Sequence, residues 1–163
     1  MWVLLSYRMP REPSTPRIAV WRALKRLGVA QLGDGLVALP ADARTREYLE
    51  WVADQVTEAG GEASIWLAHP ASTSQERRLA TRMAAARAEE YATVLAEAEA
   101  ALSGEPAART AIVRRLRGEL RRIGRRDYFP PVERDQAHAA VTALAAAVRD
   151  ADQRETEERQ DTP

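Results

Sequence analysis

The order of apolar patterns along the first seventy residues constrains the fold of this chain more than any other feature. Four short apolar runs have the length of strands, and two longer segments between them carry apolar side chains at helical spacing. The runs are residues 2–9, 29–32, 36–39 and 63–68, and the helical segments are residues 16–27 and 45–59. Gly33-Asp34-Gly35 is placed as the turn of a hairpin between the second and third runs. The resulting order, βαββαβ, predicts a ferredoxin-like sheet.

After His69-Pro70 the pattern becomes entirely helical. Three further helices are expected, ending near residues 102, 126 and 150, with Gly104, Pro106 and Pro130-Pro131 between them. We therefore expect an α+β chain in which a ferredoxin-like core over residues 1–70 is followed by a helical extension over residues 71–150 that packs on it. Residues 151–163 contain no large apolar side chain and are expected to form a flexible acidic tail.

The same periodicity predicts which side chains are buried. Ser14-Thr15 precede Pro16 and are placed to cap the first helix. The apolar stripe of that helix is expected to be Ile18, Trp21 and Leu24. The stripe of the second helix is expected to be Tyr48, Leu49, Val52 and Val56, and core positions are expected for most of the four tryptophans.

Residue types exclude most catalytic sites. The chain has no cysteine, and its two histidines, His69 and His138, are far apart in sequence, so thiolate and histidine-rich metal sites are not expected. Metal-dependent nucleases with a ferredoxin-like core need a carboxylate near the end of the first strand, where this chain has Ser6, Tyr7 and Arg8. Gly33-Asp34-Gly35 is too short for a phosphate loop. We therefore expect that the chain is not an enzyme and that it has no catalytic residue, no metal site and no cofactor.

Two features predict a cytoplasmic protein with no membrane partner. The apolar opening is too short for a signal peptide and has no basic residue before it. No stretch approaches the roughly 18 apolar residues that a bilayer span requires.

Charge is balanced overall but unevenly distributed. The formal net charge is zero, which argues against a strong general attraction to nucleic acid. Residues 105–132 nevertheless contain eight arginines and three acids, whereas residues 133–163 contain four arginines and eight acids. The basic and acidic helices can therefore neutralise each other. Lys25 is the only lysine, a pattern typical of GC-rich genomes, and this weakens any argument from arginine counts alone.

The helix over residues 109–126 is nonetheless the first candidate for contact with DNA. Placed at 100° intervals, its apolar residues lie on one side and most of its arginines on the other. The apolar residues are Ile112, Val113, Leu116, Leu120 and Ile123. The candidate DNA-binding arginines are Arg114, Arg117, Arg121, Arg122, Arg125 and Arg126. Such a face can contact phosphates without reading bases, and the alternative is an ordinary solvated face.

The first helix supplies two further candidate sites. Arg22, Lys25 and Arg26 on its outer side form a second candidate DNA contact, although basic residues are usual on any exposed helix. Arg8, Arg11, Arg17 and Thr15 surround its start and form a candidate oxyanion site, because a helix N-terminus carries free N–H groups and partial positive charge. The alternative is a capped helix with solvated arginines.

Several blocks of the chain resemble the N-terminal domain of the ChrB family of chromate-resistance regulators. They are residues 2–14, 20–28, 32–40, 58–63 and the closing Arg125-Arg126-Asp127-Tyr128-Phe129. The resemblance implies a bacterial protein of the kind that represses a chromate efflux operon and releases DNA when chromate is present. Full-length members carry a second, C-terminal domain, which this chain does not reach. A separate protein with such a domain is therefore one expected partner.

Together the residues and the resemblance predict a DNA-binding transcriptional regulator, or its regulatory half, that responds to chromate or a similar oxyanion and forms a homo-oligomer. The alternative is a dimerising interaction module without DNA binding of its own. In that case the uncovered sheet face or the alanine-rich helices would mediate assembly.

Overall fold

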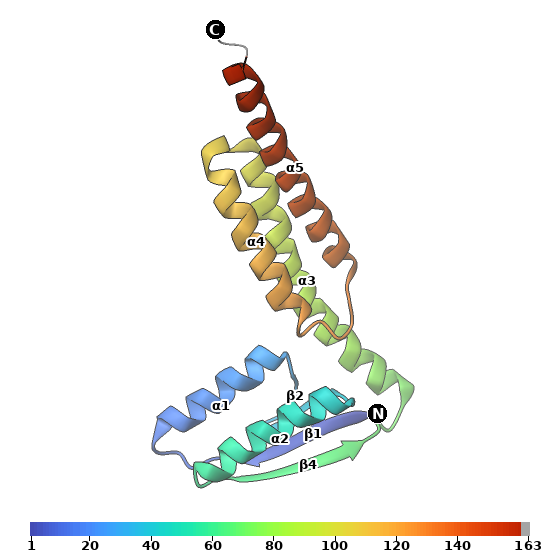
Figure 1. Ribbon diagram of the computed structural model, residues 1–163. Coiled ribbons are helices and arrows are strands. Elements are labelled where there is room, and N and C mark those ends of the chain that lie inside the picture. The colour runs from blue at the N-terminus through green and yellow to red at the C-terminus, as the bar shows by residue number, and fades with distance from the viewer. Residues whose placement is uncertain (161–163) are drawn as a thin grey trace. The chain divides into compact units, whose positions relative to one another are not determined.

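The computed structural model describes residues 1–160 and shows an α+β chain (Figure 1). Its elements are β1 (Trp2–Arg8), α1 (Ser14–Leu27), β2 (Ala30–Gly33), β3 (Leu36–Pro40), α2 (Ala43–Glu58), β4 (Glu62–Ala68), α3 (Thr73–Ser103), the 3-10 turn η1 (Pro106–Ala108), α4 (Arg109–Gly124) and α5 (Val132–Gln160). The chain divides into two compact units, Met1–Met83 and Ala84–Pro163, here called the sheet unit and the helical unit. The long helix α3 contributes residues to both.

The sheet is antiparallel, with strand order β2-β3-β1-β4. The central strand β1 pairs Val3 with Leu39 on one side and with Leu67 on the other. Since side chains on adjacent strands share a face when they are paired, Val3, Leu5, Val37 and Leu39 lie together, and all four are fully buried. The helices α1 and α2 contact each other, and α2 packs on β1 and β4. This layer is the core of the sheet unit.

The hairpin between β2 and β3 turns at Asp34-Gly35, as the sequence predicted. Gly35 has φ 70°, in the left-handed region that favours glycine, and its carbonyl accepts a hydrogen bond from the Tyr7 N–H at 2.7 Å. The turn is thereby joined to the end of β1.

The helix α2 begins with a capping box. The carboxylate of Asp42 accepts a hydrogen bond from the Thr45 N–H at 2.7 Å, and the Thr45 hydroxyl accepts one from the Asp42 N–H. The hydrogen bond from the Thr45 backbone lowers the pKa of Asp42, more than its slight desolvation raises it. Leu49, Val52 and Val56 are fully buried, as expected, whereas Tyr48 is exposed.

One expectation for α1 is wrong, and another is confirmed only for Leu24. Its N-cap is Pro13 and no side chain caps the helix, so Ser14 and Thr15 lie in the first turn instead of before it. Its buried residues are Val20, Ala23 and Leu24. Leu24 is buried as expected, whereas Val20 and Ala23 take the buried positions expected for Ile18 and Trp21.

The expectation that most tryptophans are buried is also wrong. Trp2 is buried, and its indole N–H donates to Glu76 at 2.9 Å. The other three, Trp21, Trp51 and Trp66, are each more than half exposed. Trp21 and Trp51 each follow or precede a buried valine on the same helix, Val20 and Val52, whereas β4 has no buried residue beside Trp66.

The helical unit is built from α3, α4 and α5 around a core of its own (Figure 1). Each helix contributes at regular spacing. The core residues are Tyr91, Val94, Ala98, Ala101, Val113, Leu116, Leu120, Ile123, Ala137, Val141, Leu144 and Ala145.

The last helix extends further than the sequence indicated. We expected it to end near residue 150, but α5 continues through residues 151–160. Residues 161–163, the end of the predicted tail, lie outside the described part of the chain. The flexibility of this segment stays a prediction.

Candidate nucleic-acid interface

The helix α4 has one buried side and one basic side. Val113, Leu116, Leu120 and Ile123 are buried and Ile112 is partly buried, which confirms the predicted inner face. Because these positions recur every three or four residues, the arginines between them are directed outward. Arg114, Arg117, Arg121 and Arg125 are all exposed.

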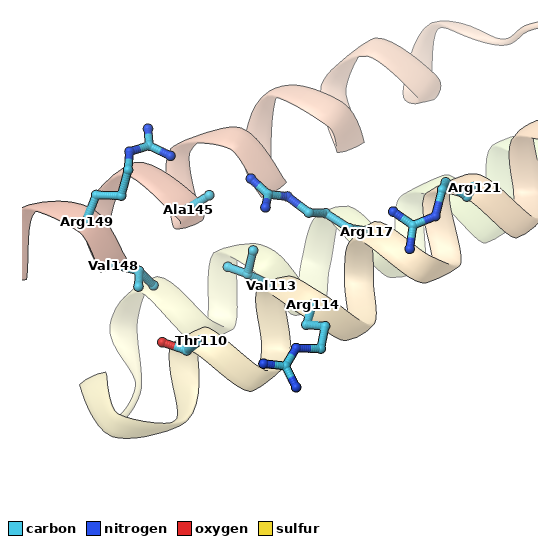
Figure 2. A pocket seen from close by; sticks show the side chains of 8 residues that line it. All are labelled: Thr110, Val113, Arg114, Arg117, Arg121, Ala145, Val148 and Arg149. Atoms are coloured by element: carbon cyan, nitrogen blue, oxygen red, sulfur yellow. The ribbon is translucent and has the colours of Figure 1, made fainter. Parts of the chain in front are cut away.

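Three of these arginines border a groove between α4 and α5. The α4 groove has a volume of about 390 Å³ (Figure 2). Its lining residues are Thr110, Val113, Arg114, Arg117, Arg121, Ala145, Val148 and Arg149. Val113, Ala145 and Val148 give it an apolar floor. Figure 2 shows Arg117 extending into the space between the two helices, with Arg149 contributed by α5.

The other predicted arginines of this helix are held by carboxylates. Arg122 pairs with Glu119 one turn earlier on α4. Arg126 pairs with Glu90 of α3 at 2.6 Å. Arg115, which flanks the same face, pairs with Glu97 of α3. The predicted set therefore divides into two arginines paired with carboxylates, Arg122 and Arg126, and four exposed arginines, Arg114, Arg117, Arg121 and Arg125.

The expected neutralisation of the basic helix by the acidic one does not occur where side chains are described. Within that part of the chain, the ion pairs of α4 run to α3 or within α4 itself, and none joins α4 to α5. No ion pair is found there for Arg114, Arg117, Arg121, Arg125 or Arg149. The guanidinium groups that border the α4 groove therefore have no ion pair among the described residues.

A buried polar cluster lies at the C-terminal end of α4. Tyr91 of α3 is fully buried, and its hydroxyl donates to Asp127 at 3.0 Å. Desolvation by burial, together with the Asp127 carboxylate, raises the pKa of Tyr91 to about 12. Glu90 bridges Arg87 and Arg126 beside it. The cluster fixes the segment after α4 against α3, and it includes Arg126 and Asp127 of the closing block.

The predicted sites of the sheet unit are partly brought together. Arg8, Arg17 and Arg22 line a hollow of about 790 Å³ beside the hairpin turn, whereas Arg11 and Thr15 do not border it. The ammonium group of Lys25 lies 4.4 Å from the centre of the Trp21 ring. Arg26 is exposed on the same helix. DNA binding by Arg22, Lys25 and Arg26, and oxyanion binding at the start of α1, stay predictions.

Two residues of these sites were not singled out from the sequence. Arg149 lies outside the basic block, but it follows Ala145 by one helical turn and so shares the side of α5 that meets α4. That spacing is a signal that could have identified it. Trp21 was assigned to the core, and its exposure follows from packing that periodicity does not reveal.

Two searches of residues 1–160 bear on other kinds of site. No three His, Asp or Glu side chains gather there closely enough to hold a metal ion. None of the described helices combines the length and the apolar character that crossing a bilayer demands.

Comparison with known proteins identifies relatives over much of the chain. The family described as "Protein ChrB, N-terminal" matches residues 17–106, from α1 to the end of α3 and into η1. A protein named Protein ChrB from Cupriavidus metallidurans is 29% identical over 133 residues, which cover 79% of this chain and 40% of that protein. The chain thus spans less than half the length of this relative. No solved structure matches the chain.

Proposed function

Because the chain belongs to the ChrB N-terminal family, we propose that it is a non-enzymatic, DNA-binding regulator associated with chromate resistance, acting in the cytoplasm. The family match ends at residue 106, before α4 begins, so the DNA contact is argued from the geometry of α4 alone.

The observation that carries this proposal is the set of unneutralised arginines around the α4 groove. Arg114, Arg117 and Arg121 occupy successive turns of one helix and span about 10 Å along its axis. Arg149 adds a guanidinium from the facing helix. A row of this kind suits the phosphates of a DNA backbone, which supply most of the affinity in non-specific binding. It gives affinity and register without reading bases.

Salt dependence is the most direct test of this contact. We expect the purified chain to retard DNA from upstream of its own operon in a mobility-shift assay, with an affinity that falls steeply as salt rises. Measured at several salt concentrations, the slope gives the number of phosphates neutralised. Affinity that does not change with salt contradicts the proposal.

We also propose a fold class for the sheet unit. We assign it to the ferredoxin-like class. Its element order βαββαβ and its strand order β2-β3-β1-β4 support this assignment. An experimental structure of this unit is the test, and a different strand order would overturn the assignment.

A second candidate function is a homo-oligomeric interaction module. The observation that favours it is the exposure of Trp66 and Leu67 on β4, which lies at an edge of the sheet. Edge strands with exposed apolar side chains are common sites of pairing between chains. Light scattering that shows a dimer, combined with no retardation of DNA at low salt, favours this function over the first.

A further inference from the structure

A hollow in the sheet unit has no role in the proposed function. It lies where the end of β1, the outer side of α1 and the hairpin turn meet, and it is here called the α1 hollow. Its lining residues are Tyr7, Arg8, Met9, Arg17, Ile18, Trp21, Arg22, Gln31, Asp34 and Gly35.

One wall of the α1 hollow is aromatic and exposed. Trp21 is 52% exposed and Ile18 is 44% exposed. The ammonium group of Lys25 lies over the indole ring, which polarises the ring but leaves half of the side chain in water. An exposed indole beside an exposed isoleucine is a surface on which a flat aromatic ring can stack.

The rest of the wall is cationic. Arg8, Arg17 and Arg22 are exposed, and within residues 1–160 none of them forms an ion pair. Asp34 is the one acid that lines the hollow. A ligand held by these groups therefore carries negative charge, and guanidinium groups bind phosphate oxygens in forked pairs.

The size of the hollow favours a phosphorylated organic anion over a bare inorganic oxyanion. Its volume of about 790 Å³ lies within the range of sites for small organic molecules. A bare tetrahedral oxyanion such as chromate or sulfate is much smaller, and it would leave the indole wall without a contact. A phosphorylated heteroaromatic compound uses both walls.

We propose that the α1 hollow binds a free mononucleotide. Its base stacks on Trp21 beside Ile18, and its phosphate is held by Arg8, Arg17 and Arg22. The carboxylate of Asp34 accepts hydrogen bonds from a ribose hydroxyl or an exocyclic amine. The site lies in the sheet unit and is independent of the DNA contact proposed for α4.

Calorimetric titration of the full chain with AMP, GMP, CMP and UMP tests this proposal. At least one nucleotide is expected to bind about tenfold or more tightly than its nucleoside or inorganic phosphate, because each of those engages only one wall. Trp21→Ala and Arg17→Ala are each expected to weaken binding by about tenfold, as loss of one stacking or charged contact does. Trp51→Ala, which removes an equally exposed tryptophan from α2, is the matched control and leaves binding unchanged.

Four outcomes overturn the proposal. They are no heat from any of the four nucleotides at about 1 mM, phosphate binding as tightly as the nucleotide, unchanged affinity in Trp21→Ala, and a short single-stranded oligonucleotide that binds through Trp21 more tightly than any mononucleotide. The last would assign the hollow to an unstacked base of a strand. None of them affects DNA retardation by the α4 arginines, so the two proposals fail separately.

Discussion

Gly35 shows how one backbone position fixes the hairpin to the sheet. Its φ of 70° is strained for any other residue, and a Cβ atom there would overlap the Tyr7 carbonyl oxygen. Gly60 has a similar φ of 77°, but no atom lies within 4 Å of its would-be Cβ. Comparing substitutions at these two glycines therefore distinguishes the cost of backbone strain, which both share, from the cost of steric overlap, which only Gly35 has.

We therefore expect Gly35→Ala to destabilise the chain by about 2–4 kcal/mol and Gly60→Ala by about 1 kcal/mol. Both substitutions force an alanine into the left-handed backbone conformation, and only the one at Gly35 also displaces β1. Urea unfolding of the two variants checks this. Equal losses would mean that the contact with Tyr7 relaxes without cost.

The raised pKa of Tyr91 leads us to predict how the free energy of unfolding depends on pH in the alkaline range. Burial raises its pKa to about 12 in the folded chain, whereas an unfolded tyrosine has a pKa of about 10. Between these values the unfolded chain releases the proton and the folded chain retains it, so the free energy of unfolding falls as pH rises. The slope from this group is at most about 1.4 kcal/mol per pH unit.

Tyr91→Phe is the matched variant. It removes the hydroxyl that donates to Asp127 and is expected to cost about 1–3 kcal/mol at neutral pH. Tyr91→Phe also makes stability fall less steeply above pH 10. Burial and the Asp34 carboxylate raise the pKa of Tyr7 as well, so Tyr7 contributes part of the pH dependence that remains in the variant. Denaturant titrations at pH 8, 10 and 11 compare the two proteins, and an unchanged slope in the variant contradicts the assignment.

At the scale of the element, α4 divides its arginines by their partners. Arg115 and Arg122 are neutralised by carboxylates, whereas Arg117 extends into the α4 groove without an ion pair in the described part of the chain. A paired arginine must lose its carboxylate before it binds a phosphate, so its contribution to DNA affinity is smaller.

Arg117→Ala is expected to weaken DNA binding severalfold and to reduce the salt slope by about 1. Arg115→Ala is the matched control on the same helix and is expected to change the slope much less. Mobility shifts at several salt concentrations measure both. If the two variants lose equal affinity, ion pairing does not select the DNA-contacting arginines.

The elements also show what the sequence could and could not predict. Apolar period and turn residues identified the β-strands and α-helices of the described chain in order but not the 3-10 turn η1, because the former signals are local and repeated. They placed Val113, Leu116 and Ile123 inside α4 correctly. They failed for Trp21 and Tyr48, which flank the true stripe, because the choice between neighbouring stripes depends on the shape of the facing elements. Periodicity also could not show that Arg126 is held by Glu90, since that pair joins residues 36 positions apart.

At the scale of the whole molecule, a formal charge of zero coexists with a basic surface on one helix. Acids of α3 pair with Arg115 and Arg126, and Glu119 pairs with Arg122. Arg114, Arg117 and Arg121 have no ion pair in the described part of the chain. The proposed contact with DNA is therefore local and does not depend on net charge. Balanced charge also limits the electrostatic acceleration of encounter, so the affinity proposed here depends on the placement of a few guanidinium groups.

The two units have separate cores, and a substitution in one core tests whether they unfold separately. Leu116 is fully buried in the helical unit, and Leu116→Ala is expected to destabilise that unit by about 2–5 kcal/mol. Leu102→Ala, at a position that is 37% exposed on α3, is the control and costs about 1 kcal/mol or less. Hydrogen exchange resolves the effect by region: Leu116→Ala accelerates exchange of amides in α4 and α5, while β1 and β3 keep their protection. Equal acceleration in the sheet would show that the two cores unfold as one cooperative unit, with α3 transmitting the loss from one to the other.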